Sequence, residues 1–360
     1  MIATQELRDL GQSVWLDNIT RELLEAGTIQ HYIDDYGVSG LTSNPSIFEQ
    51  AIASGAYDED IVAAARQGLS HEEIFFHLAL DDLRRAADLF APIHRRTDGV
   101  DGWVSLEVSP LLAYDTARTV ASVADLHQRA GRANLFVKIP GTPEGLPAIE
   151  ESVAAGIAVN VTLLFDAAQY RAAADAYLRG VERRIAAGLN PAVGSVASLF
   201  ISRWDVAVAT TVPADLRNRL GLAVGHEVYQ AYREWLASPR VQRALNFGGR
   251  PQRLLWASTK TKDPAAPDTL YVEGLTAPFT INTMPDSTLA AVVDHATVTS
   301  AMAPDGVEHR EVLARFAAAG VDTVELAGRL QREGAAAFTR SWNELLSRID
   351  TQLTPTQETP

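Results

Sequence analysis

The chain has no cysteine among its 360 residues. This absence excludes a disulfide framework, a thiolate metal site and a cysteine nucleophile. The eight histidines show neither a His-Glu-x-x-His motif nor the paired spacing of metal ligands, so we expect no metal. No Gly-x-Gly-x-x-Gly follows a strand candidate and no Walker-type loop occurs, so we expect no cofactor of the nucleotide kind. Gly-x-Ser-x-Gly is absent as well, which disfavours a serine hydrolase.

Basic residues are also fewer than acidic residues in this chain. Lys and Arg number 31 against 45 Asp and Glu, which gives a formal net charge of -14. A balance of this sign argues against nucleic acids or anionic membranes as the main partner. A small anionic substrate stays possible, because a few local basic residues can bind phosphate on an acidic protein.

Long apolar runs are missing too. No segment reaches the roughly 18 consecutive apolar residues of a membrane helix. The N-terminal stretch, residues 1–9, is polar and lacks the basic region followed by an apolar core that marks a signal peptide. We therefore expect no membrane association and a cytoplasmic location.

Eight apolar or alternating segments predict short β-strands, most of them separated by helical patterns. They lie at residues 12–18, 38–44, 102–108, 134–140, 157–165, 192–200, 253–258 and 279–284. Strands that alternate with helices are typical of a single parallel (β/α)8 TIM barrel, an α/β fold. Such a barrel takes about 250 residues. We therefore expect the helical stretches at about 50–95, 205–250 and 308–350 to be additions to one domain spanning residues 1–350, with a polar tail at 351–360.

One lysine, Lys138, interrupts the apolar segment 134–140. Because alternate side chains of a strand point to opposite faces, Lys138 shares its face with Asn134 and Phe136. Burial among apolar neighbours disfavours an ammonium ion, and a free amine can attack a carbonyl to form a Schiff base. The alternative is a buried lysine that is paired with a carboxylate for structural reasons.

Polar residues stand near the carboxyl ends of seven predicted strands, where the active sites of such barrels lie. They are Asp17, Asn44, Glu107, Lys138, Asn160 with Thr162, Ser198 with Arg203, and Ser258 with Lys260. Each has an ordinary explanation, because strand ends meet water and Asn or Ser there often caps the next helix. Together they supply a nucleophile, two carboxylates and several hydroxyl or amide groups, which suits carbonyl chemistry.

Five ordered motifs give the chain a strong resemblance to a known family. They are Val-Ser-Gly-Leu-Thr-Ser-Asn-Pro-Ser at 38–46, Val-Ser-Leu-Glu-Val at 104–108, Asn-Leu-Phe-Val-Lys-Ile-Pro-Gly-Thr at 134–142, Gly-Ile-Ala-Val-Asn-Val-Thr-Leu-Leu-Phe at 156–165, and the pair Ser198 and Arg203. In this order they resemble transaldolase, most closely its longer bacterial form. The resemblance spans the predicted strands from about residue 12 to residue 285.

The resemblance implies a transferase of the non-oxidative pentose phosphate pathway. Members of this family move a dihydroxyacetone unit from sedoheptulose 7-phosphate to glyceraldehyde 3-phosphate, giving erythrose 4-phosphate and fructose 6-phosphate. Position by position, Lys138 matches the Schiff-base lysine, and Asp17 matches the acid/base group that removes the C4 hydroxyl proton of the donor. Glu107 and Thr162 match residues that hold a catalytic water.

The same comparison implies a set of substrate-binding residues. Asn44 and Asn160 match groups that hydrogen-bond the dihydroxyacetone moiety. Ser198 and Arg203 match the contacts to a substrate hydroxyl and to phosphate. Shorter members carry a second phosphate-binding arginine after the seventh strand. This chain instead has two lysines there, Lys260 and Lys262, which offer a point charge without the bidentate geometry of arginine.

Two other functions stay open. A fructose 6-phosphate aldolase would use the same lysine chemistry but release dihydroxyacetone to water, although the chain length and the Glu107–Thr162 pair favour transaldolase. A catalytically silent barrel that serves as a binding or scaffold protein would be expected to have lost the lysine, the carboxylates or the arginine, and all are present. We expect small-molecule sugar phosphates as partners, no nucleic acid, and either a monomer or a homodimer.

Overall fold

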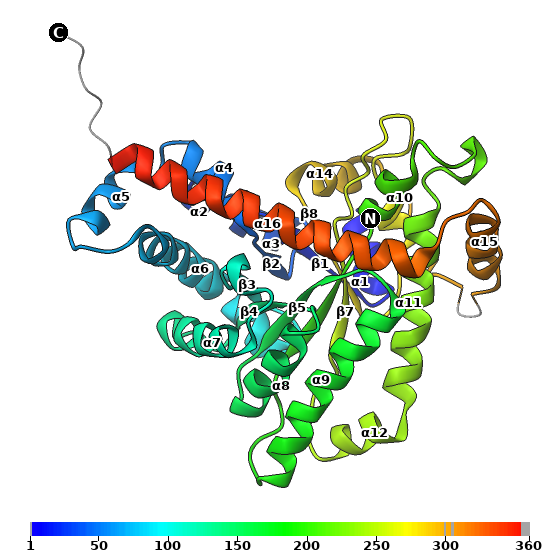
Figure 1. Cartoon of the computed structure of the whole chain (residues 1–360), viewed down its shortest axis with the longest axis horizontal. Helices are drawn as coiled ribbons and strands as arrows, with labels where there is room; N and C mark the ends of the chain where they lie inside the picture. Colours follow the sequence, from blue (N-terminus) through cyan, green and yellow to red (C-terminus); the bar gives the residue numbers. More distant parts are fainter. Residues whose placement is uncertain (1, 299, 304–305, 354–360) are drawn as a thin grey trace.

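A closed barrel of eight parallel strands lies at the centre of the computed structural model, which describes residues 2–298, 300–303 and 306–353 (Figure 1). The strands are β1 (Gln12–Asp17), β2 (Gly40–Thr42), β3 (Val104–Glu107), β4 (Leu135–Pro140), β5 (Val159–Leu164), β6 (Ser195–Phe200), β7 (Arg253–Ala257) and β8 (Thr280–Met284). Each strand pairs with its neighbours in sequence, and β8 closes the barrel on β1. The predicted (β/α)8 barrel is confirmed.

Strand β2 is much shorter than the segment 38–44 that predicts it. The reason lies in Asn44, whose Oδ1 accepts a hydrogen bond of 3.2 Å from the backbone N–H of Ile47 and so caps the next helix. Pro45 then occupies the first helical position, where its missing N–H is not needed. The chain therefore leaves the barrel soon after Thr42.

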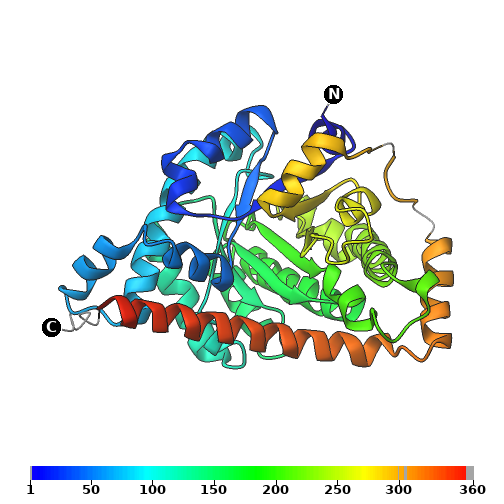
Figure 2. The ribbon, with the colours of Figure 1, turned by 90° about the horizontal axis from the view of Figure 1, so that it is seen from above.

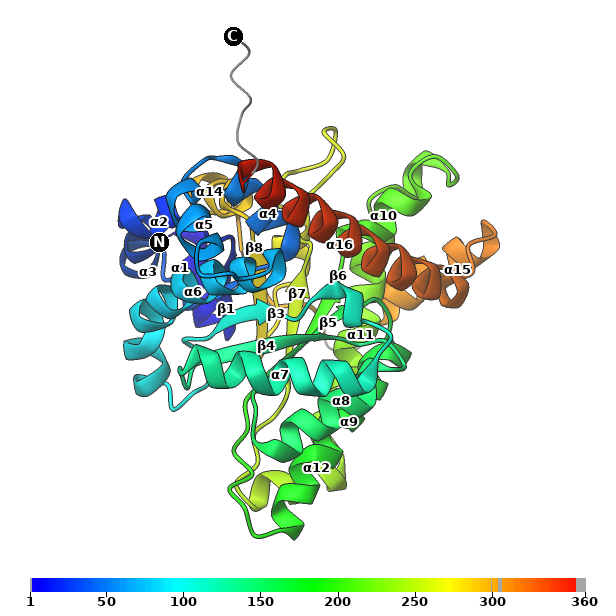
Figure 3. The same ribbon diagram turned by 60° about the vertical axis from the view of Figure 1, so that its left-hand side comes forward.

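Helices cover the outside of the barrel; for example, α7, α8 and α9 lie over β4, β5 and β6 (Figure 3). The α-helices of the described residues are α1 (Ala3–Asp9), α2 (Arg21–Glu25), α3 (Thr28–Asp35), α4 (Pro45–Ala53), α5 (Asp58–Ala65), α6 (His71–Arg96), α7 (Thr116–Ala130), α8 (Gly145–Ala155), α9 (Ala167–Ala186), α10 (Ser202–Val208), α11 (Leu220–Ala237), α12 (Pro239–Asn246), α13 (Leu270–Gly274), α14 (Asp286–His295), α15 (Val307–Ala318) and α16 (Thr323–Leu353). Two short 3-10 turns, η1 (Pro110–Leu112) and η2 (Ala214–Leu216), complete the set.

Helices occupy the three stretches that were expected to be additions to the barrel. Helices α4 to α6 stand between β2 and β3, α10 to α12 between β6 and β7, and α15 and α16 after β8. Among them, α6 begins at a capping box formed by Ser70 and Glu73. Short α1, α3 and α13 were not predicted, because five to eight residues show too little periodicity to be recognised.

The last helix, α16, runs from α15 to α4 and packs against α4, α5 and α6 (Figure 2). It is tied to the barrel by Gln331, whose Nε2 donates to the carbonyls of Gly141 and Leu163, at 3.0 Å each. It also continues through Leu353, three residues into the predicted polar tail, and residues 354–360 lie outside the described residues. These contacts support the single domain over residues 1–350, which stays a prediction.

Within the described residues, no helix combines the length and the apolar character needed to cross a membrane.

Candidate active site

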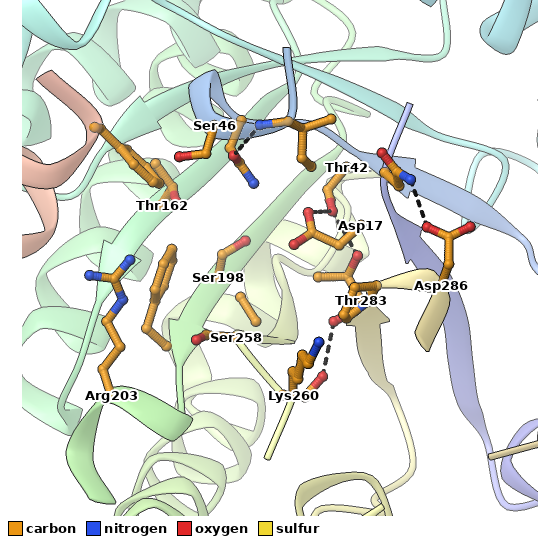
Figure 4. A pocket seen from close by; sticks show the side chains of 18 of the residues that line it. Asp17, Thr42, Ser46, Thr162, Ser198, Arg203, Ser258, Lys260, Thr283 and Asp286 are labelled. Atoms are coloured by element: carbon orange, nitrogen blue, oxygen red, sulfur yellow. Dashed lines mark hydrogen bonds between the residues drawn. The ribbon is translucent and has the colours of Figure 1, made fainter. Parts of the chain in front are cut away.

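A pocket of about 500 Å³ opens at the carboxyl ends of the strands (Figure 4). Of the ten residues to which the family resemblance assigns a role, eight line it: Asp17, Asn44, Lys138, Thr162, Ser198, Arg203, Lys260 and Lys262. Figure 4 shows Asp17 and Thr42 across the pocket from Arg203, with Ser198 and Ser258 between them. The two remaining predicted residues, Glu107 and Asn160, do not line this pocket and lie behind its wall.

Lys138 is buried in β4, next to Glu107 of β3 in the strand register. Its Nζ lies 3.1 Å from Glu107 Oε2 and donates a hydrogen bond of 2.8 Å to the carbonyl of Ser43. Burial raises the pKa of Glu107, while the charge of Lys138 opposes that rise. A carboxylate with a raised pKa next to an amine is suited to take up the proton of the amine.

All three lysines of the chain, Lys138, Lys260 and Lys262, line this one pocket. The basic residues elsewhere in the chain are arginine and histidine. Amine chemistry by lysine is therefore confined to this pocket. The rarity of lysine relative to arginine in the sequence was therefore a signal that each lysine could have a role in the site.

Asp17 ends β1 and faces the pocket. Its Oδ1 accepts a hydrogen bond of 2.7 Å from the hydroxyl of Thr42, and Thr42 Oγ1 lies 2.7 Å from Thr283 Oγ1. Since the single hydroxyl proton of Thr42 goes to Asp17, Thr283 donates to Thr42, and the carboxylate is held in a fixed orientation. Burial raises the pKa of Asp17, whereas the charge of Lys138 and the bond from Thr42 partly offset that rise.

Thr162 presents a polar atom that lacks a partner. Its Oγ1 is buried and makes no hydrogen bond within the described part of the chain. The side chain of Glu107 has no partner there besides Lys138. Buried polar atoms are normally satisfied, so a hydroxyl and a carboxylate left in this state suit an ordered water or a substrate group.

Asn160 supports the wall of the pocket from behind. It is fully buried in β5, where its Oδ1 accepts a hydrogen bond of 2.7 Å from the hydroxyl of Ser198. Its Nδ2 donates to Ser105 Oγ at 3.2 Å. Ser198 therefore stands between Asn160 and the open pocket, although both residues were predicted to contact substrate.

Three cations, Arg203, Lys260 and Lys262, form what we call the cationic cluster. None of them makes an ion pair with a described carboxylate. Burial lowers the pKa of Lys262, and the charges of Lys260 and Arg203 lower it further. Burial also lowers the pKa of Arg203. An anion bound here would replace lost hydration and relieve the repulsion, so the cluster is suited to phosphate.

Several pocket residues were missed by sequence reasoning. Thr42 is the last residue of β2, and a polar residue at the carboxyl end of a strand is a local signal that could have been recognised. Phe338 comes from α16 and Asp286 from the start of α14. Asp286 accepts hydrogen bonds from Asn18 and Tyr32. Only the packing of distant helices brings Phe338 to the pocket, so no local pattern could have indicated it.

No group of three or more His, Asp or Glu side chains in the described ranges is arranged to hold a metal ion.

Comparisons with known proteins show which family the chain belongs to. The model of the Transaldolase/Fructose-6-phosphate aldolase family matches residues 14–349. A transaldolase of Thermobifida fusca is 45% identical, over 97% of this chain and 98% of that protein. Transaldolases of Saccharopolyspora erythraea and Neisseria gonorrhoeae are 44% and 41% identical, over 97% of this chain and 97% and 100% of their own lengths. The chain therefore belongs to the transaldolase/fructose-6-phosphate aldolase family and, like these relatives, is an enzyme that transfers aldehyde or ketone residues.

Proposed function

We propose that the chain moves a dihydroxyacetone unit from sedoheptulose 7-phosphate to glyceraldehyde 3-phosphate through a Schiff base at Lys138. The observation that carries this proposal is the placement of Lys138. It is buried in the pocket that holds the cationic cluster, 3.1 Å from a carboxylate able to accept its proton. The proposal includes the non-oxidative pentose phosphate pathway, a cytoplasmic location, and a monomer or homodimer.

The first step is attack of the Lys138 amine on the ketone carbon of the donor. Lys138 first gives a proton to Glu107, whose pKa is raised by burial. The neutral amine adds to the ketone carbon, and a proton moves from its nitrogen to the ketone oxygen, which gives a carbinolamine. A water between Glu107 and Thr162 then carries the proton of Glu107 to the carbinolamine hydroxyl, which leaves as water. The product is an iminium ion at Lys138.

The second step is cleavage of the C3–C4 bond. Asp17 removes the proton of the C4 hydroxyl, the C4 carbon becomes the aldehyde of erythrose 4-phosphate, and the bonding electrons move into the iminium ion. The result is a neutral enamine that keeps three carbons on Lys138. The Thr42 hydroxyl holds the Asp17 carboxylate in place for this transfer.

The third step runs the cleavage in reverse with a new partner. The enamine carbon attacks the aldehyde of glyceraldehyde 3-phosphate, and protonated Asp17 returns its proton to the new C4 oxygen. Water then hydrolyses the imine and releases fructose 6-phosphate. Transfer rather than hydrolysis requires that the enamine persists until the acceptor arrives.

The cationic cluster is proposed to hold the phosphate group of both donor and acceptor. We expect Arg203→Ala to lower kcat/KM for fructose 6-phosphate by about 10- to 100-fold, as for loss of a charge-assisted hydrogen bond. The rate with unphosphorylated fructose should not change. Steady-state kinetics with both sugars would check this.

Arg203→Lys is the matched variant for this prediction, because it keeps the charge and removes the planar fork. An intermediate loss is expected. Equal losses with fructose and fructose 6-phosphate would mean that Arg203 acts on the fold of the pocket and does not bind phosphate.

The family also contains fructose 6-phosphate aldolases, so transfer must be separated from simple cleavage. With fructose 6-phosphate alone, we expect one dihydroxyacetone unit held per chain and no sustained release of free dihydroxyacetone. Addition of erythrose 4-phosphate should start steady formation of sedoheptulose 7-phosphate and glyceraldehyde 3-phosphate. Steady release of dihydroxyacetone at the same rate with and without the acceptor would instead assign an aldolase.

A further inference from the structure

A second cavity, of about 890 Å³, opens at the opposite end of the barrel. Its walls come from residues at the amino-terminal ends of several strands, including Gln12 of β1, Ser195 of β6 and Arg253 of β7. It shares no lining residue with the active-site pocket. Catalysis in these barrels takes place at the carboxyl ends, so this cavity needs a different explanation. Its volume is within the range of small-molecule sites, about 300–1,000 Å³.

The inner floor of the cavity is polar, and its side chains are hydrogen-bonded. The guanidinium of Arg253 donates to Ser13 Oγ at 2.7 Å and to the carbonyl of Thr280 at 3.0 Å. Asp101 accepts from Ser13 at 2.6 Å and from Trp15 Nε1 at 2.8 Å. Beside this cluster, Gln12 is fully buried, and its Oε1 has no hydrogen-bond partner within the described residues. The floor therefore consists of polar side chains that mainly hydrogen-bond to one another.

Two arginines without an ion-pair partner in the described part of the chain stand at the mouth of the cavity. Arg8 and Arg96 line it, and neither makes an ion pair or a side-chain hydrogen bond within the described residues. The guanidinium of Arg8 lies against Gly37, where a Cβ would overlap it. Asp34, also at the mouth, accepts a hydrogen bond from Gln30. A basic mouth on a chain of net charge -14 favours an anion.

The same mouth has an apolar side. Phe279 is 71% exposed and holds a left-handed backbone with φ 61°, an uncommon state for a bulky residue. Its backbone N–H donates to the carbonyl of Gly11 at 2.9 Å, and its carbonyl accepts from the Tyr232 hydroxyl at 3.0 Å, so the backbone of Phe279 is fixed at the opening. Deeper in, Trp103 stacks on Phe136 with 4.0 Å between ring centroids. Aromatic and apolar walls suit an aromatic body.

We propose that this cavity binds a small organic anion that joins an aromatic body to a phosphate group, of about the size of a nucleoside monophosphate. The aromatic body lies among Phe279, Trp103 and the apolar wall, and the phosphate meets the guanidinium groups of Arg8 and Arg96. Guanidinium matches phosphate because its planar fork can bond two oxygens. The binding site is independent of the proposed reaction.

Isothermal titration calorimetry of the full chain with adenosine 5′-monophosphate tests the proposal. Fructose 6-phosphate is present at saturation, so that the cationic cluster is occupied. We expect one site per chain with a dissociation constant below about 1 mM. Adenosine alone and inorganic phosphate alone should each bind at least about tenfold more weakly, because each lacks one half of the contacts.

The double variant Arg8→Ala/Arg96→Ala is expected to weaken binding about tenfold or more and to keep normal turnover. Arg95→Ala is the matched control, since Arg95 is exposed beside Arg96 but does not line the cavity. Unchanged binding in the double variant would overturn the proposal. So would binding heat that is seen in a parallel titration without fructose 6-phosphate but is absent in its presence, because it would place the ligand in the active-site pocket. Binding that is lost as the chain dimerises would also overturn it and assign the cavity to a subunit contact.

Discussion

Replacement of Lys138 by alanine is expected to lower turnover on the order of 10⁶-fold, the scale seen when a covalent nucleophile is removed. The physical reason is that no other amine can take its place. Lys260 and Lys262 belong to the cationic cluster, and both precede α13 in the loop after β7. Borohydride reduction in the presence of fructose 6-phosphate should trap a dihydroxyacetone adduct in the unsubstituted chain and none in the variant.

Tryptic mapping can place the adduct without ambiguity. An unmodified chain is cut after Arg132, Lys138 and Arg171, which gives peptides 133–138 and 139–171. An alkylated Lys138 is not cut, so the adduct appears on a joined peptide 133–171. An adduct on Lys260 or Lys262 in place of Lys138 would refute the proposed nucleophile.

Two further variants distinguish loss of the nucleophile from unfolding of the chain. Lys138→Ala leaves Glu107 buried without its ion-pair partner, which can cost several kcal/mol if Glu107 stays charged. Lys138→Met keeps the packing of the lysine stem and should be equally inactive while its thermal unfolding stays closer to that of the parent. Lys260→Ala removes another lysine of the same pocket and should still form the adduct on Lys138.

Replacement of Asp17 by alanine is expected to block cleavage but not imine formation. Loss of a general base typically costs 10²- to 10⁴-fold in rate. Reduction with borohydride should then trap the whole six-carbon sugar phosphate on Lys138, because the C3–C4 bond is not broken. Mass spectrometry separates this adduct from the three-carbon adduct of the parent. A three-carbon adduct formed at the parental rate in Asp17→Ala would assign the proton transfer to another group.

The pH profile offers a second measurement on Asp17. As the general base it must be ionised, so activity should fall as the pH is lowered through its pKa. Burial raises that pKa above the usual value of 3.8, so the acid limb of kcat is expected above pH 3.8. Asp286→Asn is an informative second variant, since Asp286 lines the same pocket and its charge contributes to the raised pKa of Asp17. Its acid limb should lie at lower pH than that of the parent.

The alternation of strands and helices was sufficient to predict the barrel. Strand β4 is apolar on both faces because one face lines the barrel interior and the other lies under helices, so its pattern marks a buried parallel strand. The same parity places Lys138 on the inner face with Phe136. The predicted strand boundaries were less accurate where a residue caps the next helix. Asn44 was predicted to end the second strand, but it is the N-cap of α4.

The sequence alone determined the fold, the family resemblance and eight of the residues that line the pocket, because these depend on local periodicity and on residues next to strand ends. The tertiary structure decided which of the predicted residues face the pocket and which lie behind its wall. Glu107 and Asn160 stand behind the pocket wall, since their neighbours Lys138 and Ser198 project past them. Phe338 reaches the site only because α16 folds back over the barrel. Contacts between segments so distant along the chain leave no local pattern, so only the packed structure could reveal them.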